Sequence, residues 1–433
     1  MERWISVLGT VVLVGIAWLF SMNRKKINWK TVGVGIALQV ILALIVLVSP
    51  PGRWFFSKMN DVIVRMLSFS EDGARFLFGN LVANYIPVGV LENHNFVETI
   101  RTVAYGGAFF AFSVLPTIIF FSSLMSVMYY LGVMQLIVLA FAKVMTKFMG
   151  VSGAESLSCS ANIFVGQTEA PLLVRPFISD MTKSELLAVM TGGMATVAGG
   201  VMAAYVGMLK DYFPSIAGHL LTASVMSAPA ALVMAKIILP ETGESKTAGV
   251  VKIHYEKTDA NIIDAAANGA TVGLQLALNV AGCLIAFMSL LAMLNFLIGW
   301  TGGLVGFAGL SLQKIFGFIF APLAWIMGVP WKDCFIIGNL MGVKTAVNEF
   351  VAYFDFAVFI KQNPGVLAER SMIIATYALC GFSNFLSIAI QIGGIGALAP
   401  NRRHDLAKLG LWAVLAGSLA CFMSATIAGI LIK

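Results

Sequence analysis

Charged residues are scarce in this chain. Of its 433 residues only 11% are Asp, Glu, Lys or Arg, whereas 59% are hydrophobic. Soluble domains carry roughly 25% charged residues, and here the apolar residues form long runs instead of amphipathic stripes. The composition therefore excludes an ordinary soluble domain and predicts a polytopic membrane protein.

Cysteine is also sparse, and a signal-peptide cleavage site is lacking. The five cysteines lie in apolar segments without paired spacing, so they indicate neither a disulfide framework nor a zinc site. The first apolar run, 5–20, is followed by Arg24, Lys25 and Lys26 and not by small residues. We expect this run to remain in the protein as a transmembrane helix.

Long apolar runs are what the sequence has in abundance. About eight reach the roughly 20 residues that a bilayer requires: 4–22, 31–49, 105–131, 185–209, 219–238, 269–299, 369–395 and 409–431. If the basic loop 23–30 is cytoplasmic, the positive-inside bias also places Lys143, Lys147 and the 240–262 connection there. Both termini are then expected outside.

Two further apolar stretches, 150–180 and 331–362, are each split midway by polar residues. We interpret both as re-entrant hairpins that enter from opposite sides, since irregular backbone survives at membrane depth only inside protein or beside a water-filled cavity. Each is followed by a span that small and polar residues interrupt, 192–200 and 380–387. This order, repeated with opposite orientation, predicts the inverted repeat of secondary transporters.

The remaining stretches are assigned by their polarity. The amphipathic runs 53–69 and 311–328 are expected to lie along the membrane interface. The stretch 70–104 is too polar to cross and is expected outside.

The hairpins carry the residues that point to chemistry. Glu169 and Glu349 are ionisable groups at membrane depth, which are costly and usually mark a substrate or ion pathway. Gln167 and Thr168 add an amide and a hydroxyl beside Glu169, a set suited to the polar edge of a heterocycle.

The second hairpin and the interrupted span after it supply a different set. Glu349, with Asn384 and Ser387, suits a sugar diol, because a carboxylate can accept hydrogen bonds from two adjacent hydroxyls. Phe382 could pack on an apolar face of the same ligand. Near the first hairpin, the oxygens of Asn162 and Thr196 suit a hard cation such as sodium.

Structural roles remain alternatives at this stage. The glutamates could pair with Lys344 or Arg175. Gln167, Thr168 and Asn162 could cap helices, and Phe382 could be simple packing.

Four motifs in order, ANIFVGQTEAPLL, TVAGGVMAAY, VNEFVAY and CGFSNFLSIAIQIGGIG, resemble the concentrative nucleoside transporter family. The resemblance implies an all-α elevator-type transporter, a homotrimer in the bacterial inner membrane, with sodium as coupling ion and no other cofactor. It implies that Gln167, Thr168, Glu169 and Val201 meet the nucleobase, that Glu349, Asn384 and Ser387 meet the ribose, and that Phe382 lies against the base. Sodium ligands would be Asn162, Thr196 and the carbonyls of Val165 and Val197.

The resemblance also implies a division into a static scaffold and a moving transport part. Scaffold helices are expected in 1–50, 105–131 and 269–299, with interfacial and external helices in 51–104. The two transport halves are expected at 132–238 and 300–433, joined through a cytoplasmic loop at 239–268.

The expected function is import of nucleosides, both uridine-like and purine nucleosides, driven by a sodium gradient. No enzymatic chemistry is expected. A proton-coupled symporter is the nearest alternative, since some relatives are driven by protons. An intramembrane enzyme using both glutamates as acid and base on a sugar-bearing substrate, or a passive channel, belongs to a different class.

Overall fold

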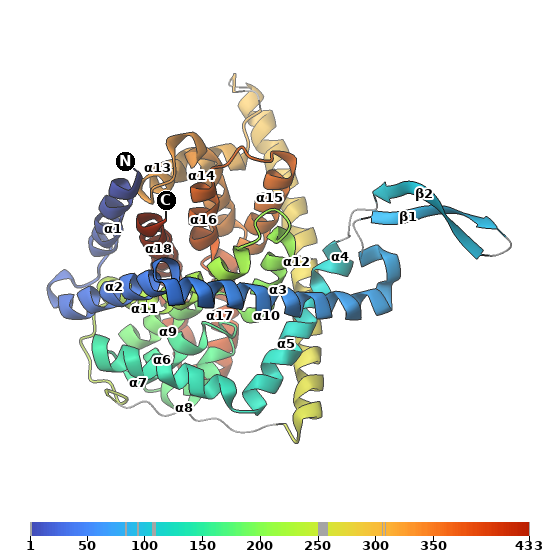
Figure 1. Cartoon of the computed structure of the whole chain (residues 1–433). Helices are drawn as coiled ribbons and strands as arrows, with labels where there is room; N and C mark the ends of the chain where they lie inside the picture. The colour runs from blue at the N-terminus through green and yellow to red at the C-terminus, as the bar shows by residue number, and fades with distance from the viewer. Residues whose placement is uncertain are drawn as a thin grey trace.

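The computed structural model describes residues 2–82, 85–92, 95–105, 110–249, 259–304, 306–307 and 309–432. Its architecture is helical, as predicted (Figure 1). Among these described residues, seven helical segments are long and apolar enough to cross a membrane, or up to eight if the bent pair α13–α14 counts as one span. The expected span 369–395 is divided between α16 and the short apolar helix α17, with the break at the interruption predicted for 380–387.

The N-terminal helices precede the repeat. They are α1 (Glu2–Leu19), α2 (Trp29–Ala43) with a π-helical extension (Leu44–Val48), α3 (Pro50–Phe78), α4 (Phe110–Ser113) and α5 (Leu115–Tyr130). Figure 1 shows α3, which contains the amphipathic run 53–69, lying across the bundle.

A β-hairpin projects from the helical body between α3 and α4 (Figure 1). Strands β1 (Tyr85–Glu92) and β2 (Asn95–Tyr105) pair antiparallel, with Tyr85 opposite Tyr105. The expectation of external helices over this part of 51–104 was therefore wrong, because its β-branched and aromatic residues favour strands.

The inverted repeat is present as two series of seven described elements. Their order matches if η4 and α8 together correspond to α15, and η5 has no counterpart in the first series. The first series is α6 (Val133–Met149), α7 (Gly153–Ala161), η4 (Ala170–Val174), α8 (Arg175–Ile178), α9 (Lys183–Ala195), α10 (Gly199–Leu209) and α11 (Ile216–Ile238). The second is α13 (Leu312–Ile326), α14 (Trp331–Ala346), α15 (Glu349–Gln362), α16 (Glu369–Leu379), α17 (Phe385–Leu398), η5 (Pro400–Arg402) and α18 (Arg403–Leu431). We call residues 153–178 hairpin 1 and residues 331–362 hairpin 2.

Hairpin 2 lies at the end of the bundle that carries both termini, whereas hairpin 1 lies at the opposite end (Figure 1). The termini are held together there, since Arg3 Nε donates to the Ile432 carbonyl at 2.9 Å. The first helix of each series, α6 and α13, precedes its hairpin. The amphipathic run 311–328 predicted α13, whereas no predicted element corresponds to α6.

The N-terminal helices are divided between two environments. Helix α1 packs along α18 and α2 packs along α11, whereas α5 packs along the 43-residue helix α12 (Ile262–Leu304). Only 6% of the most apolar 18-residue window of α12 is buried within the chain. One side of the molecule is therefore built of α5 and α12, outside both series of the repeat.

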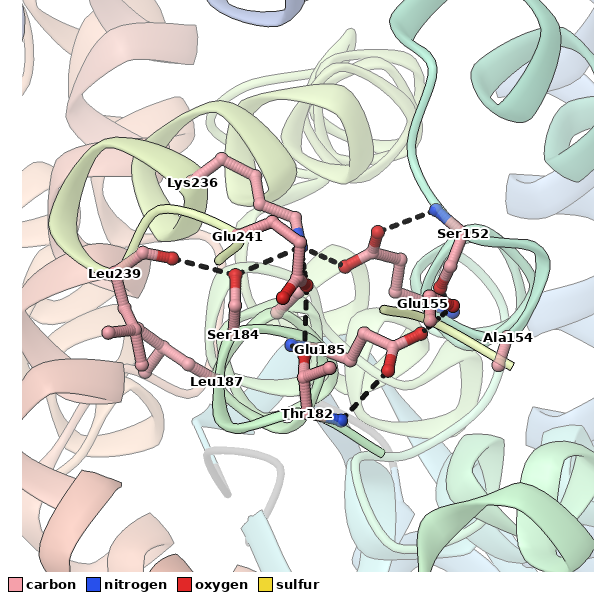
Figure 2. A network of polar contacts seen from close by, with 12 residues as sticks. Ser152, Ala154, Glu155, Thr182, Ser184, Glu185, Leu187, Lys236, Leu239 and Glu241 are labelled. Atoms are coloured by element: carbon pink, nitrogen blue, oxygen red, sulfur yellow. Dashed lines mark hydrogen bonds and ion pairs between the residues drawn. The ribbon is translucent and has the colours of Figure 1, made fainter. Parts of the chain in front are cut away.

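A buried ion-pair cluster fixes the base of hairpin 1 (Figure 2). Lys236 on α11 lies between Glu155 of α7, at 2.8 Å, and Glu241, at 3.2 Å. Glu155 also closes a capping box with Ser152, and Thr182 donates to Glu241. We call Glu155, Lys236, Glu241 and Thr182 the base clamp. It joins the starts of α7 and α9 to the end of α11. Residues 250–258 of the connection that follows lie outside the described residues.

Candidate functional site

The tip of hairpin 1 is unwound because α7 stops at Ala161 and no helix follows until η4 at Ala170. Within this segment Gly166 N donates to Glu169 Oε2 at 3.2 Å, and Glu169 N donates back to the Gly166 carbonyl. The turn thus orients the Glu169 carboxylate with backbone bonds alone. Its side chain remains exposed to a cavity.

Gln167 points the other way, into the helical interior, where it is 6% exposed. Its Nε2 donates to Ser387 Oγ at 3.1 Å, and its Oε1 accepts from Gln391 Nε2 at 3.0 Å. Both partners lie on α17. Gly193 makes room for this contact, since a Cβ there would lie 2.8 Å from Gln167 Cβ and from Gln391 Nε2.

Glu349 is the first residue of α15 and is 5% exposed. Its Oε2 accepts from Asn384 Nδ2 at 2.6 Å and its Oε1 accepts from the Tyr205 hydroxyl at 3.2 Å. A helix N-terminus also favours a carboxylate, because its amide groups carry partial positive charge. A buried carboxylate is thereby provided with donors from α10 and from the start of α17.

These contacts connect the two hairpins. Asn384 caps α17 by accepting from Ser387 N at 2.9 Å, so Gln167, Ser387, Asn384 and Glu349 form one hydrogen-bonded series. We call it the polar bridge. It brings together four residues that lie up to 220 positions apart in sequence.

The two broken spans meet at their breaks. Phe382 N donates to the Thr196 carbonyl at 3.3 Å. Gly381 has φ +110, and a Cβ there would lie 2.7 Å from the backbone of Ala195. Only glycine satisfies both requirements, so the crossing depends on this residue. Phe382 is half-buried beside it.

The predicted ion ligands lie around the first break. Asn162 is 1% exposed, and its Nδ2 donates to the Ser158 carbonyl in the way the capping alternative predicted. Its Oδ1, however, has no hydrogen-bond partner. Buried polar atoms are seldom left unpaired. An orphan acceptor, with the buried residues Thr196, Val165 and Val197, fits a hard cation.

A cavity of about 1030 Å³ lies between hairpin 1 and the helices α5 and α12. Of the predicted residues, Val165 and Glu169 line it, facing Ser122 and Gln275 across the cavity. Glu349 does not line it, and Glu169 is not a member of the polar bridge. Among the described residues the two glutamates therefore share neither a cavity wall nor a hydrogen-bonded series. Thr168 packs on Gly394 of α17, and Val201 is buried in α10.

A structural role for Glu169 and Glu349 would need ion pairs with Lys344 or Arg175. Among the described residues these ion pairs are not formed. The Lys344 ammonium donates instead to the carbonyls of Ala378 and Cys380. Sequence reasoning missed Tyr205 and Gln391. Their signal was the same as that of Glu349: a polar group within an apolar run, TVAGGVMAAY or SIAIQIGGIG.

Comparison with known proteins assigns this chain to a family. The profile described as Na+ dependent nucleoside transporter N-terminus matches residues 8–81, Nucleoside recognition matches 111–212, and Na+ dependent nucleoside transporter C-terminus matches 219–429. An uncharacterised transporter of Haemophilus influenzae is 46% identical over 99% of this chain and 97% of its own. The chain belongs to the sodium-dependent nucleoside transporter family.

Solved structures of this transporter family agree with the fold. CNTnw in an inward-facing, substrate-bound state aligns over 100% of this chain and 98% of its own, with a TM-score of 0.89 and 45% identity. An outward-facing CNTnw variant aligns with a TM-score of 0.90 and also 45% identity. Sodium/nucleoside cotransporter 1 of Rattus norvegicus is 39% identical over 99% of this chain, which spans 64% of that longer protein.

Membership in this family confirms a multi-pass membrane transporter and excludes the intramembrane enzyme. The recognition made from the four motifs is confirmed, as is the helical, elevator-type fold.

Proposed function

We propose that this transporter imports uridine-like nucleosides, and also purine nucleosides, in symport with sodium. The polar bridge is the observation that carries the proposal. Its groups now hydrogen-bond to one another, so a nucleoside could enter by exchanging those bonds for its own at little net cost.

We assign the nucleobase to Gln167, Thr168, Glu169 and Val201, and the ribose to Glu349, Asn384 and Ser387. Phe382 at the crossing would lie against the base. The exposed carboxylate of Glu169 on the cavity wall supports entry from that cavity. The paired donors on Glu349 support exchange with ribose hydroxyls, because these can donate to the same two oxygens.

We assign sodium to the Asn162 and Thr196 side chains and the carbonyls of Val165 and Val197. An ion there would hold the unwound tip of hairpin 1 against the first break. Ion and nucleoside would then each raise the affinity of the other by the same factor.

The elevator division that we propose differs in one respect from the sequence expectation. Helices α5 and α12, with α3, would be static, and the two series of the repeat would move. Because α1 packs on α18 and α2 on α11, residues 1–50 would move with the repeat and not with the scaffold. A homotrimer in the bacterial inner membrane, with both termini outside, completes the proposal; the exposed apolar length of α12 suits a subunit contact.

The test is uridine binding by calorimetry to purified protein in sodium chloride and in potassium chloride. We expect binding in sodium to be at least about tenfold tighter, the usual scale of a coupling free energy. Equal affinities would reject sodium coupling. A dependence on pH in place of sodium would favour the proton-coupled alternative.

A further inference from the structure

Lys344 is a buried cation that the proposed transport site does not use. It lies on α14, two residues before that helix ends at Ala346, and is 1% exposed. Its ammonium donates to the carbonyls of Ala378, at 2.9 Å, and Cys380, at 3.3 Å. These carbonyls are at the C-terminal end of α16, where the helix breaks.

A charge in this position needs an explanation. Within the described part of the chain, no carboxylate lies within 4.0 Å of the Lys344 ammonium, although Glu349 is near enough for the two charges to attract each other. A buried ion without a directly bonded counter-ion costs several kcal/mol. What it contacts instead is the negative end of a helix dipole and carbonyl groups that have lost their helical partners. These are also the groups that bind sodium in transporters with broken helices.

The inverted repeat supplies the comparison. In the first series of the repeat, the proposed sodium site lies between two helix ends. Asn162 follows the end of the hairpin helix α7, and Thr196 follows the end of α9, which is the first part of the broken span. In the second half, the corresponding place lies between the end of α14 and the end of α16. The Lys344 ammonium occupies that place.

We infer that Lys344 is a tethered cation that takes, in the second half of the repeat, the place that sodium takes in the first. The inference rests on the proposed sodium site. The second break is then permanently neutralised, which holds Phe382 and Asn384 in position whether or not sodium is bound. Sodium organises only the base side of the site, and the transporter couples through a single ion site.

The experiment compares three variants of the full-length protein. Lys344→Ala opens a space lined by the two carbonyls. Lys344→Met fills the same space without a charge, and Lys332→Ala removes an exposed charge from the same helix. Uridine binding is measured over a range of sodium concentrations, with and without methylammonium chloride.

We expect Lys344→Ala to bind uridine at least about tenfold more weakly at sodium concentrations that saturate the wild type, because the carbonyls lose their cation. Methylammonium, or a higher sodium concentration, should restore binding, and the Hill coefficient for sodium should rise from about one towards two. Lys344→Met should be weakened without rescue, because no cation can enter. Lys332→Ala should match the wild type.

Wild-type binding and sodium dependence in Lys344→Ala or Lys344→Met would overturn the inference, as would an intact Lys344→Ala that neither cation restores. If Lys344→Ala purifies intact only with methylammonium or high sodium present, the inference is supported. If it purifies with neither, the role of Lys344 is structural and the inference fails.

Thermal unfolding without nucleoside separates this inference from the proposed function. Methylammonium should raise the Tm of Lys344→Ala and leave that of Lys344→Met and the wild type unchanged. Wild-type protein that shows no sodium-dependent uridine binding would reject the proposed function, while the Tm comparison would still decide the role of Lys344.

Discussion

The candidate site consists of polar side chains that hydrogen-bond mostly to one another. Glu349 is held by Tyr205 and Asn384, and Gln167 is held by Ser387 and Gln391. Because few of these bonds involve regular secondary structure, each can be removed singly with little effect on the helices. Residue-scale predictions therefore concern affinity more than folding.

Replacing Glu349 with Gln removes the charge and keeps the shape. A charged hydrogen bond contributes about 1.5–3 kcal/mol, so we expect uridine to bind roughly 10- to 100-fold more weakly. Calorimetry at saturating sodium measures this. Asp355→Asn, which neutralises another carboxylate on α15, is the control and should bind normally; wild-type affinity in Glu349→Gln would reject the ribose assignment.

Tyr205→Phe removes the hydroxyl that donates to Glu349. The rings of Tyr205 and Tyr353 are stacked at 4.2 Å, so the substitution keeps the packing. Because the ribose is proposed to displace this hydrogen bond of about 1 kcal/mol, its absence predicts roughly fivefold tighter uridine binding. Tyr353→Phe is matched, because its hydroxyl donates to the Thr376 carbonyl instead; an equal effect of both variants on uridine affinity would show that Tyr205 does not act through Glu349.

At the scale of elements, the fold depends on two kinds of junction. The broken spans cross where Gly381 lies against Ala195, and hairpin 1 is anchored by the base clamp around Lys236. The crossing depends on the absence of a side chain at Gly381, and the base clamp depends on the charge of Lys236. Each junction can therefore be disrupted separately by a single substitution.

Gly381→Ala should damage the crossing. It adds a Cβ 2.7 Å from the Ala195 backbone at a φ of +110, which together predict a loss of at least about 1–3 kcal/mol of stability. Thermal unfolding measures the loss. Gly393→Ala on α17, whose Cβ would meet nothing within 4 Å, should leave Tm unchanged or slightly raised; equal Tm values for both variants would contradict the crossing.

Lys236→Met should weaken the anchoring of hairpin 1. It leaves Glu155, which is 1% exposed, without its counter-ion, and breaking a buried pair costs about 3–5 kcal/mol. Lys246→Met removes the exposed pair with Asp180 and should cost at most about 1 kcal/mol. Proteolysis of hairpin 1 and thermal unfolding compare the two, and an equally small loss in both would exclude a clamp.

The clamp also predicts a pH dependence. Burial disfavours the Glu241 carboxylate, but the Lys236 ammonium and hydrogen bonds from Thr182 and Gly243 outweigh it and lower the pKa of Glu241 below its usual 4.5. Its contribution is therefore complete above pH 4.5 and is lost as the pH falls further. In Glu241→Gln this part of the acid sensitivity should be absent.

At the scale of the whole molecule, the two series of the repeat enter from opposite ends and share one polar bridge. The alternating access that we propose would use the cavity beside hairpin 1, and the similar protein CNTnw has been solved in inward- and outward-facing states. A passive channel needs no such pair of states.

Proteoliposomes with a sodium gradient test this directly. For one ion per neutral nucleoside at zero membrane potential, a tenfold gradient should concentrate uridine up to about tenfold. Dissipating the gradient should release the excess. Uptake that stops at equal concentrations would indicate a channel.

Much of this architecture could be predicted from the sequence. Long apolar runs located most of the spans, because the bilayer fixes their length. Polar residues inside such runs located the hairpin tips and the breaks, because a buried polar group needs a reason. The β-hairpin was missed, since the conformation of a polar stretch that does not cross the membrane is not constrained by the bilayer.

Local sequence thus determined which segments lie in the membrane, where they break and which side chains are out of place there. Only the tertiary structure decided how those side chains meet: that Lys344 caps α16 and is not the partner of Glu349, that Tyr205 and Gln391 join the bridge, and that Glu169 faces the cavity alone. Apolarity and chain breaks are properties of neighbouring residues, whereas hydrogen-bond partners here are separated by up to 224 positions and are chosen by packing.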